Sequence, residues 1–250
     1  MEYWIFSNNA NEAKQLIDSG VTHICVDLEH IGKVERQKSR DTLISKHSIY
    51  DILKISELIG KERTICRINP IHVNTKSEIE AAISNGARSI ILPYFKTVKE
   101  VSLFIELVNK KAKTIALLET PQALIRLPEI VKLSGLDHIH IGLNDLSIGL
   151  GFEDMFEVVR LGWMEQIANT YFSNGKITFG FGGVSALDDP TTRYPARDII
   201  SHHVRSNSKS VILSRGFFKY CQVKSSELNT SYWSTVQEEM KKIDDLISHF

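Results

Sequence analysis

The sequence predicts a single (β/α)8 barrel, also called a TIM barrel, that spans residues 1–250. Eight short runs rich in β-forming residues are each followed by a helical pattern. This alternation indicates parallel strands joined by right-handed crossovers. Eight such units in 250 residues fit a closed barrel better than an open doubly wound sheet. A dinucleotide-binding sheet would require G-x-G-x-x-G after an early strand, but the glycine-rich stretch at 180–183 comes late and lacks that spacing.

The elements follow from local signals. The eight predicted strands are residues 3–6, 23–28, 64–68, 89–94, 114–119, 138–143, 177–181 and 210–214. Three Ser/Thr-x-x-acid pairs predict helix N-termini between the strands: Ser48 with Asp51, Thr75 with Glu78, and Thr97 with Glu100. Four glycines stand where helices are expected to end: Gly20, Gly60, Gly86 and Gly135.

Two connections are long, residues 30–47 after the second strand and residues 143–176 after the sixth. Long insertions without secondary structure of their own are commonly lids or binding loops, and we expect both near the site. The last helix carries an apolar stripe at 3,4,3,4 spacing: Trp233, Val236, Met240, Ile243 and Ile247. The first interpretation of this stripe is that it covers the barrel, and the second is that it packs on a second subunit. We also expect a homo-oligomer, which the second interpretation would explain.

Composition excludes several classes of partner. Thirty basic residues balance thirty acidic ones, which argues against nucleic acid or an anionic membrane as the main partner and leaves a small molecule. No apolar run is long enough to span a membrane, and the N-terminus does not resemble a signal peptide. Three cysteines, Cys25, Cys66 and Cys221, form no close-spaced metal pattern and cannot all pair internally, which fits a reducing cytoplasm.

Catalytic residues of TIM barrels gather at the carboxyl ends of the strands. Polar and special residues at these ends are Asp27, Glu29 and His30, then Arg67, Pro93 and Tyr94, then Glu119 and Asp145, and finally Gly182, Gly183, Ser214 and Arg215. Taken singly, Glu119 and Asp145 are explained by helix caps or turns. Together they place two carboxylates on adjacent strands, where a shared cation would relieve their repulsion. Oxygen ligands with open positions suit Mg²⁺ or Mn²⁺.

Four further residues have competing interpretations. Arg67 either pairs with a neighbouring acid or binds a substrate oxygen, because its charge cannot be removed by deprotonation. His30 either is a surface residue or serves as a general base oriented by Asp27. His138 and His140 form an H-x-H pattern that resembles a zinc site, but they lie at the start of their strand, so we interpret them as structural.

Five segments together resemble the HpcH/HpaI aldolase and citrate lyase β-subunit family. They are VDLEH (26–30), CRINP (66–70), IILPYFKTVKEV (90–101), ALLETPQAL (116–124) and GLNDLSIGLG (142–151). The resemblance covers residues 22–151 well. The chain departs from the aldolase pattern at Leu117, where glutamine is usual, at Leu143, and at the bulky Tyr94 and Phe95.

The resemblance implies a metal-dependent carbon–carbon lyase, a class II aldolase that cleaves a 4-hydroxy-2-oxo acid to pyruvate, or a related 2-oxo acid, and an aldehyde. It assigns Mg²⁺ or Mn²⁺ binding to Glu119 and Asp145, enolate stabilisation to Arg67, and proton transfer to Asp27 and His30. It also implies substrate-binding roles for Pro93, Gly142, Leu143 and Asn144.

Two alternatives remain. One is a citrate-lyase-like enzyme that cleaves a coenzyme A or carrier thioester, whose phosphates would meet four basic residues: Lys33, Arg36, Lys38 and Arg40. The other is a barrel that binds a metabolite without catalysis.

Overall fold

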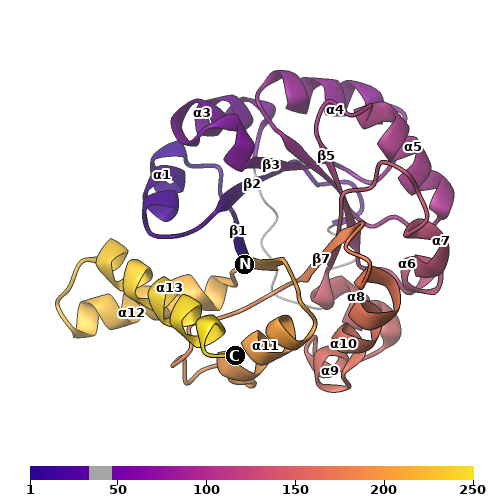
Figure 1. The fold of residues 1–250 in the computed structure, drawn as a ribbon. Helices are drawn as coiled ribbons and strands as arrows, with labels where there is room; N and C mark the ends of the chain where they lie inside the picture. Colours follow the sequence, from indigo (N-terminus) through magenta and orange to yellow (C-terminus); the bar gives the residue numbers. More distant parts are fainter. Residues whose placement is uncertain (34–46) are drawn as a thin grey trace.

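The chain folds into a closed barrel of eight parallel strands in sequential order (Figure 1). The computed structural model describes residues 1–33 and 47–250. The strands are β1 (Glu2–Phe6), β2 (His23–Asp27), β3 (Thr64–Arg67), β4 (Ser89–Leu92), β5 (Lys113–Leu118), β6 (His138–Ile141), β7 (Thr178–Phe181) and β8 (Ser210–Ile212). Pairing of β1 with β8 closes the ring. The predicted fold class is therefore confirmed, and every predicted strand is present.

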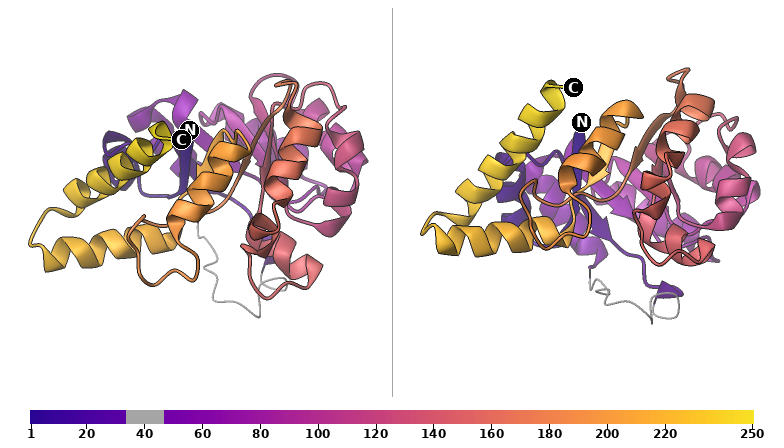
Figure 2. Two further views of the ribbon diagram at one scale, coloured as in Figure 1. Left: turned by 60° about the horizontal axis from the view of Figure 1, so that its bottom comes forward. Right: turned by 90° about the horizontal axis from the view of Figure 1, so that it is seen from below.

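Helices surround the strands, as Figures 1 and 2 show. Those before β6 are α1 (Ala10–Asp18), α3 (Ile49–Ile59), the short 3₁₀ helix η1 (Lys61–Arg63), α4 (Thr75–Ser84), α5 (Val98–Val108), α6 (Pro121–Ile125) and α7 (Leu127–Ile130). Those after β6 are α8 (Leu143–Leu150), α9 (Glu157–Arg160), α10 (Trp163–Ile167), the π-helical turn η2 (Ala168–Phe172), α11 (Ala196–Arg205), α12 (Arg215–Glu227) and α13 (Tyr232–Ser248).

Strand alternation sorts side chains into two cores. One core fills the barrel and contains Trp4, Cys25, Ile65, Ile91, Ile115 and Leu117. The larger core lies between the strands and the helices and contains the alternate strand residues, such as Val26, Cys66 and Ala116. Because successive strand residues point to opposite faces, the inward row of each strand continues to its carboxyl end and determines which residues face the mouth of the barrel.

The region after β6 differs from the prediction. The strand ends at Ile141, and Asn144 and Asp145 lie in the first turn of α8 instead of in a loop. Residues 143–176 also contain α9, α10 and η2, so this connection is not structureless. Apolar residues alternate at Ile139, Ile141 and Leu143, and this spacing predicts a strand that continues to Leu143, which explains the error.

Two of the three predicted capping pairs are confirmed. Ser48 with Asp51 and Thr97 with Glu100 form reciprocal capping boxes. The third prediction is wrong, because Asn74 is the N-cap of α4 and Thr75 is its first residue. The carboxylate of Glu78 instead accepts hydrogen bonds from the side chain and main chain of Asn69.

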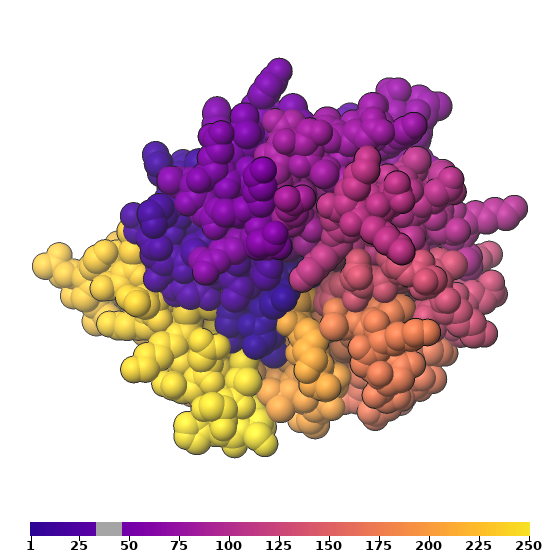
Figure 3. Space-filling model, turned by 45° about the horizontal axis from the view of Figure 1, so that its top comes forward, coloured from indigo at the N-terminus to yellow at the C-terminus, as the bar shows by residue number. Residues whose placement is uncertain are grey.

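Helix α13 closes the outside of the barrel next to β1. The stripe residues Val236, Met240 and Ile243 are buried, which confirms the interpretation that the stripe covers the barrel. The hydroxyl of Tyr3 in β1 donates a 2.5 Å hydrogen bond to Asp244, and the contact ties the two ends of the chain together. Figure 3 shows these segments next to each other, the N-terminal one in indigo and the C-terminal one in yellow.

The three cysteines are free and buried. Burial raises the pKa of the Cys25 and Cys66 thiols, so both behave as small apolar side chains. Among the described residues, no helix is both long and apolar enough to cross a bilayer.

Candidate active site

Strand alternation brings the predicted site residues to one rim. Cys25 points into the barrel, so Asp27 at the end of β2 does as well. By the same rule Arg67 follows Ile65 on β3, and Glu119 follows Leu117 at the end of β5. The carboxyl ends of parallel strands thus present two acids and one guanidinium at the mouth of the barrel, where TIM barrels carry their chemistry.

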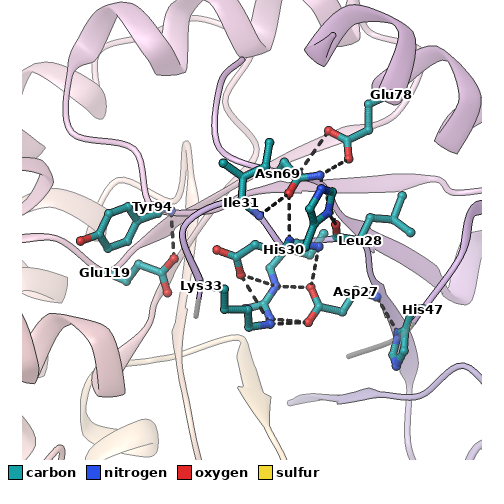
Figure 4. Close-up of polar contacts among 12 residues, drawn as sticks. Asp27, Leu28, His30, Ile31, Lys33, His47, Asn69, Glu78, Tyr94 and Glu119 are labelled. Atoms are coloured by element: carbon teal, nitrogen blue, oxygen red, sulfur yellow. Dashed lines mark hydrogen bonds and ion pairs between the residues drawn. The ribbon is translucent and has the colours of Figure 1, made fainter. Parts of the chain in front are cut away.

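Asp27 and Arg67 form the centre of a largely buried group of four charges, here called the charge cluster: Asp27, Glu29, Lys33 and Arg67. Asp27 and Lys33 are labelled in Figure 4. Arg67 donates from Nε to Oδ1 of Asp27 at 2.8 Å and from Nη2 to Oδ2 at 2.7 Å. The ammonium of Lys33 donates to Oδ2 of Asp27 at 2.7 Å. Glu29 lies 3.3 Å from Nε of Arg67 and 3.8 Å from Nζ of Lys33. Among residues 1–33 and 47–250, two cations and two anions therefore face each other in this group.

The charge cluster fixes the protonation states of its members. Burial alone would raise the pKa of Asp27, but the charges and hydrogen bonds of Arg67 and Lys33 outweigh it and hold that pKa well below its usual range. Burial alone would lower the pKa of Arg67, but Asp27 and Glu29 raise it on balance, with a contribution from Glu119. Asp27 is therefore a permanent anion.

Of the two interpretations of Arg67, the structure shows the pairing with a neighbouring acid, Asp27. Its guanidinium also stacks 4.5 Å above the ring of Phe6. Nε and one N–H of Nη2 are used by Asp27, whereas Nη1 has no partner among residues 1–33 and 47–250. Since a guanidinium carries five N–H groups, Arg67 keeps donors for a substrate oxygen while it is paired.

Glu119 is positioned by two main-chain features. Its Oε1 accepts a 2.9 Å hydrogen bond from the main-chain N–H of Tyr94. Tyr94 has a φ of 47°, a left-handed conformation that costs a non-glycine residue roughly 1 kcal/mol and is typical of functional sites. On the other side, a Cβ at Gly142 would lie 2.8 Å from Oε2 of Glu119. Position 142 must therefore be glycine for Glu119 to hold this place.

Asp145 faces the same cavity as Glu119. A cavity of about 260 Å³ is lined by both carboxylates together with Tyr94 and Pro121. Oδ1 of Asp145 accepts a 3.0 Å hydrogen bond from the Asn144 amide. Asp145 also lies in the first turn of α8, where the helix dipole favours a negative charge.

The two carboxylates fit a divalent cation of the magnesium type. Glu119 and Asp145 supply hard oxygen donors to one cavity from adjacent strand ends. The described part of the chain contains no cluster of three or more metal-ligating side chains. Mg²⁺ commonly binds through one or two carboxylates and completes its octahedron with water and substrate, so two ligands suffice.

His30 does not pair with Asp27, which corrects the expected base–acid dyad. Its side chain is exposed, and its Nδ1 lies 3.1 Å from the carbonyl oxygen of Leu28. The carboxylate of Asp27 is already engaged by Arg67 and Lys33. The main-chain N–H groups of His30 and Ile31 both donate to Asn69, which holds this turn in place. The tautomer of His30 is thus set by a carbonyl group: Nδ1 donates, and Nε2 carries the lone pair.

The remaining predicted substrate-binding residues differ in whether their side chains can reach a ligand. Pro93 is buried directly before Tyr94, and Gly142 contacts Glu119 as described. The side chain of Leu143 lies in the outer core, so only its main chain can face a ligand. Asn144 lines a second cavity of about 910 Å³, which also contacts Asp27, Lys33 and Arg67. This larger cavity extends over apolar side chains, including Phe6, Met155, Phe156, Tyr194, Ile212 and Phe218.

Sequence reasoning missed three residues that shape the rim: Lys33, His47 and Asn69. Lys33 was considered only as part of a basic segment, and the other members of that segment, Arg36, Lys38 and Arg40, lie outside the described residues. His47 accepts a 2.8 Å hydrogen bond from the main-chain N–H of Asp27. In the sequence, the one sign that these residues could lie at the rim is that each is a polar residue near a strand end or in a long connection.

His138 and His140 lie inside the barrel, as structural residues would. Ser210 bridges them, with its Oγ 2.9 Å from Nε2 of His138 and 3.0 Å from Nδ1 of His140. Burial lowers the pKa of His138 to about 3 and that of His140 well below its usual value. Both imidazoles are neutral.

The fold and the rim together define a TIM barrel with acidic, basic and metal-competent residues at the carboxyl ends of its strands. Comparison with known proteins identifies the family. The model of the HpcH/HpaI aldolase/citrate lyase family matches residues 1–161, and the chain belongs to that family. The family comprises lyases and related enzymes. No curated protein sequence matches the chain.

Solved structures of low sequence identity share the fold. An HpcH/HpaI aldolase from Desulfitobacterium hafniense DCB-2 is 12% identical, with a TM-score of 0.68 and 91% of each chain covered. Citrate synthase SbnG is 17% identical, with a TM-score of 0.66 over 91% of this chain and 92% of the other. The citrate lyase beta subunit from M. tuberculosis, complexed with oxaloacetate and magnesium, is 17% identical, with a TM-score of 0.60 over 95% and 96%.

Proposed function

We propose that the protein is a class II aldolase, which cleaves a 4-hydroxy-2-oxo acid to pyruvate, or a related 2-oxo acid, and an aldehyde. The observation that carries the proposal is the single cavity shared by Glu119 and Asp145, on the same barrel rim as Arg67. Family membership and a structural neighbour complexed with oxaloacetate and magnesium support it.

Each residue has a role that its contacts allow. Glu119 and Asp145 would hold Mg²⁺ or Mn²⁺. The bound ion would supply positive charge next to the carboxylate and 2-oxo oxygen of the substrate. Arg67, kept rigid by Asp27, would donate its remaining N–H groups to the oxygen on which enolate charge develops.

His30 is the proposed base for the 4-hydroxyl group. Its Nε2 carries the lone pair, because Nδ1 is directed at the Leu28 carbonyl, and its side chain is exposed. Removal of the hydroxyl proton lets the C3–C4 bond break, so that C4 leaves as the aldehyde and the bonding electrons form the enolate. Asp27 contributes indirectly, since it orients Arg67 instead of His30.

A pyruvate-release screen tests the proposal. A panel of 4-hydroxy-2-oxo acids is incubated with the protein and Mg²⁺ or Mn²⁺, with and without chelator. We expect release that the chelator abolishes, and a loss of at least about 100-fold in Glu119→Gln and Asp145→Asn. Glu106→Gln is the matched control, because Glu106 is an exposed glutamate on α5, and this variant should keep full activity. Full activity in either site variant would refute the assignment.

The size of the larger cavity favours a second candidate, a citrate-lyase-like enzyme that acts on a coenzyme A or carrier thioester. About 910 Å³ next to Arg67 exceeds what pyruvate and a small aldehyde need. Isothermal titration with coenzyme A separates the two candidates. Measurable binding would favour the thioester enzyme, and no binding would remove it.

A further inference from the structure

His47 occupies a defined position between the charge cluster and the larger cavity. It directly precedes Ser48, whose capping box with Asp51 fixes the start of α3. Its own Nδ1 accepts a 2.8 Å hydrogen bond from the main-chain N–H of Asp27 (Figure 4). The ring is therefore anchored both along the chain and across to β2. It lines the same cavity as Arg67 and Lys33.

The hydrogen bond from Asp27 sets the tautomer of His47. A main-chain N–H can only donate, so Nδ1 must carry its lone pair toward it. In a neutral imidazole the proton then resides on Nε2, which makes that atom a donor. Within residues 1–33 and 47–250, no group accepts from Nε2. The half-buried ring therefore has one donor left for a ligand.

The surroundings keep His47 neutral. Burial lowers its pKa; Asp27 and Asp51 act in the opposite direction, and Lys33 and Arg67 add to the lowering. The net direction is downward. At neutral pH the ring is thus a hydrogen-bond donor without a charge, and it cannot act as a base through Nε2 because that atom already holds its proton.

His30 and His47 have opposite tautomers close to the same strand end. His30 directs Nδ1 at a carbonyl oxygen and keeps a lone pair on Nε2. His47 receives an N–H at Nδ1 and keeps a proton on Nε2. One histidine is arranged to accept a proton and the other to donate a hydrogen bond, a pairing that suits the deprotonation of a hydroxyl group followed by charge on its oxygen.

We propose that His47 is a catalytic residue whose Nε2–H donates a hydrogen bond to the C4 oxygen of the substrate. The proposal rests on the proposed aldolase function. In the cleavage direction, His30 takes the hydroxyl proton, the negative charge on O4 collapses into the aldehyde C=O, and the C3–C4 electron pair passes to the enolate. His47 stabilises the charge on O4 and transfers no proton. In the reverse direction the same N–H polarises the aldehyde carbonyl group.

Two substitutions separate this role from a structural one. Asn has a side-chain oxygen at the position of Nδ1, so His47→Asn keeps an acceptor for Asp27 and loses the donor. Gln has an amide nitrogen at the position of Nε2, so His47→Gln keeps the donor. We expect kcat/KM for cleavage to fall about 100-fold in His47→Asn and less than about 10-fold in His47→Gln. The reverse order would show that the contact with Asp27 is what matters, and would overturn the proposal.

A second assay isolates the C4 oxygen. Exchange of the pyruvate methyl protons with D₂O, in the presence of Mg²⁺, requires the enolate-forming half of the site and no aldehyde oxygen. His47→Asn should leave this exchange unchanged, and an equal loss in both assays would overturn the role at O4. His72→Asn is the matched control, because His72 is a part-buried histidine on the same rim that contacts Pro70 and Thr75. It should affect neither assay.

The outcomes distinguish failure of the proposed aldolase function from failure of the proposed role of His47. A wild-type chain without cleavage activity would refute the aldolase and this role together. An active wild type with a fully active His47→Asn variant would refute the role of His47 alone. Nitrogen-15 NMR of labelled histidines adds a test without turnover: we expect Nε2 protonated and Nδ1 unprotonated in His47 at pH 7. The opposite tautomer would overturn the proposal.

Discussion

The charge cluster and the carboxylate pair at 119 and 145 lie on the same rim but are built differently. In the charge cluster, Asp27 and Glu29 face Arg67 and Lys33, so the side chains described there pair opposite charges. Glu119 accepts a hydrogen bond from the Tyr94 main chain and Asp145 accepts one from the Asn144 side-chain amide, and both carboxylates line one cavity. The first arrangement is suited to hold a guanidinium rigid, and the second to bind a cation.

This difference separates rigidity from ligand binding. The side chains of the charge cluster are fixed by each other, and in an active site such order reduces the reorganisation needed when charge develops on a substrate. The carboxylate pair depends on main-chain features, the left-handed Tyr94 and the close approach of Gly142. Variants in the first region should therefore change stability, and variants in the second should change metal affinity.

The largest expected effect on stability is that of Asp27→Asn. This change leaves Arg67 and Lys33 buried opposite Glu29 alone, so the free energy of unfolding should fall by about 3–5 kcal/mol. Urea unfolding followed by circular dichroism measures it. Asp188→Asn is the control, because that half-exposed carboxylate pairs with Lys242 at the surface and should contribute less than about 1 kcal/mol. Equal effects of the two substitutions would contradict the buried charge balance.

Acid pH should reduce the contribution of the Asp27 carboxylate to the free energy of unfolding. The pKa of Asp27 is lower in the folded chain than in the unfolded chain, so its contribution is fully present above its ordinary value of about 3.9. It is lost as pH falls further toward the folded pKa. The difference in unfolding free energy between wild type and Asp27→Asn should therefore shrink as pH drops below about 4. A difference that stays constant down to the acid transition would argue against the lowered pKa.

His30→Ala should affect chemistry and leave both regions intact. We expect kcat for aldol cleavage to fall about 100-fold, because the general base for the 4-hydroxyl is lost. Oxaloacetate decarboxylation, which needs no hydroxyl deprotonation, should decline much less. Parallel assays on one preparation make the comparison. Equal losses in the two reactions would count against His30 as the base.

Gly142→Ala should change the carboxylate pair with a smaller effect on stability. The added methyl group would lie 2.8 Å from Oε2 and 2.9 Å from Cβ of Glu119, so the carboxylate must move. We expect about 1–3 kcal/mol of destabilisation from overpacking and a Mn²⁺ affinity at least about 10-fold weaker. Unchanged affinity would show that the position of Glu119 does not depend on Gly142.

The fold was predictable because the strand signals were redundant. Eight apolar runs in regular alternation with helices leave few topologies, and the errors were local, as at Leu143 and Thr75. Leu143 continues the alternation of Ile139 and Ile141 in β6, so nothing in the local pattern marks the change to α8. Thr75 is a good cap in isolation, but Glu78 bonds to Asn69, which no local rule anticipates.

The candidate site was predictable only in part. Alternation along β2, β3 and β5 carries Asp27, Arg67 and Glu119 to the rim, so strand assignment alone was sufficient for these three. Lys33 and His47 belong to the connection after β2, and their partners are chosen by how that connection returns over the barrel. The alternation of side chains along a strand gives no information on the course of a long connection. The pairing of His30 with Asp27 failed because Arg67 and Lys33 compete for the same oxygens.

Metal binding tests the central claim most directly. Manganese titration followed by electron paramagnetic resonance counts ions bound per chain without any assumption about the substrate. We expect one Mn²⁺ per wild-type chain, binding retained in Asp27→Asn, and binding lost in both Glu119→Gln and Asp145→Asn. Binding of the same strength in wild type and in both carboxylate variants would contradict a shared ion between residues 119 and 145.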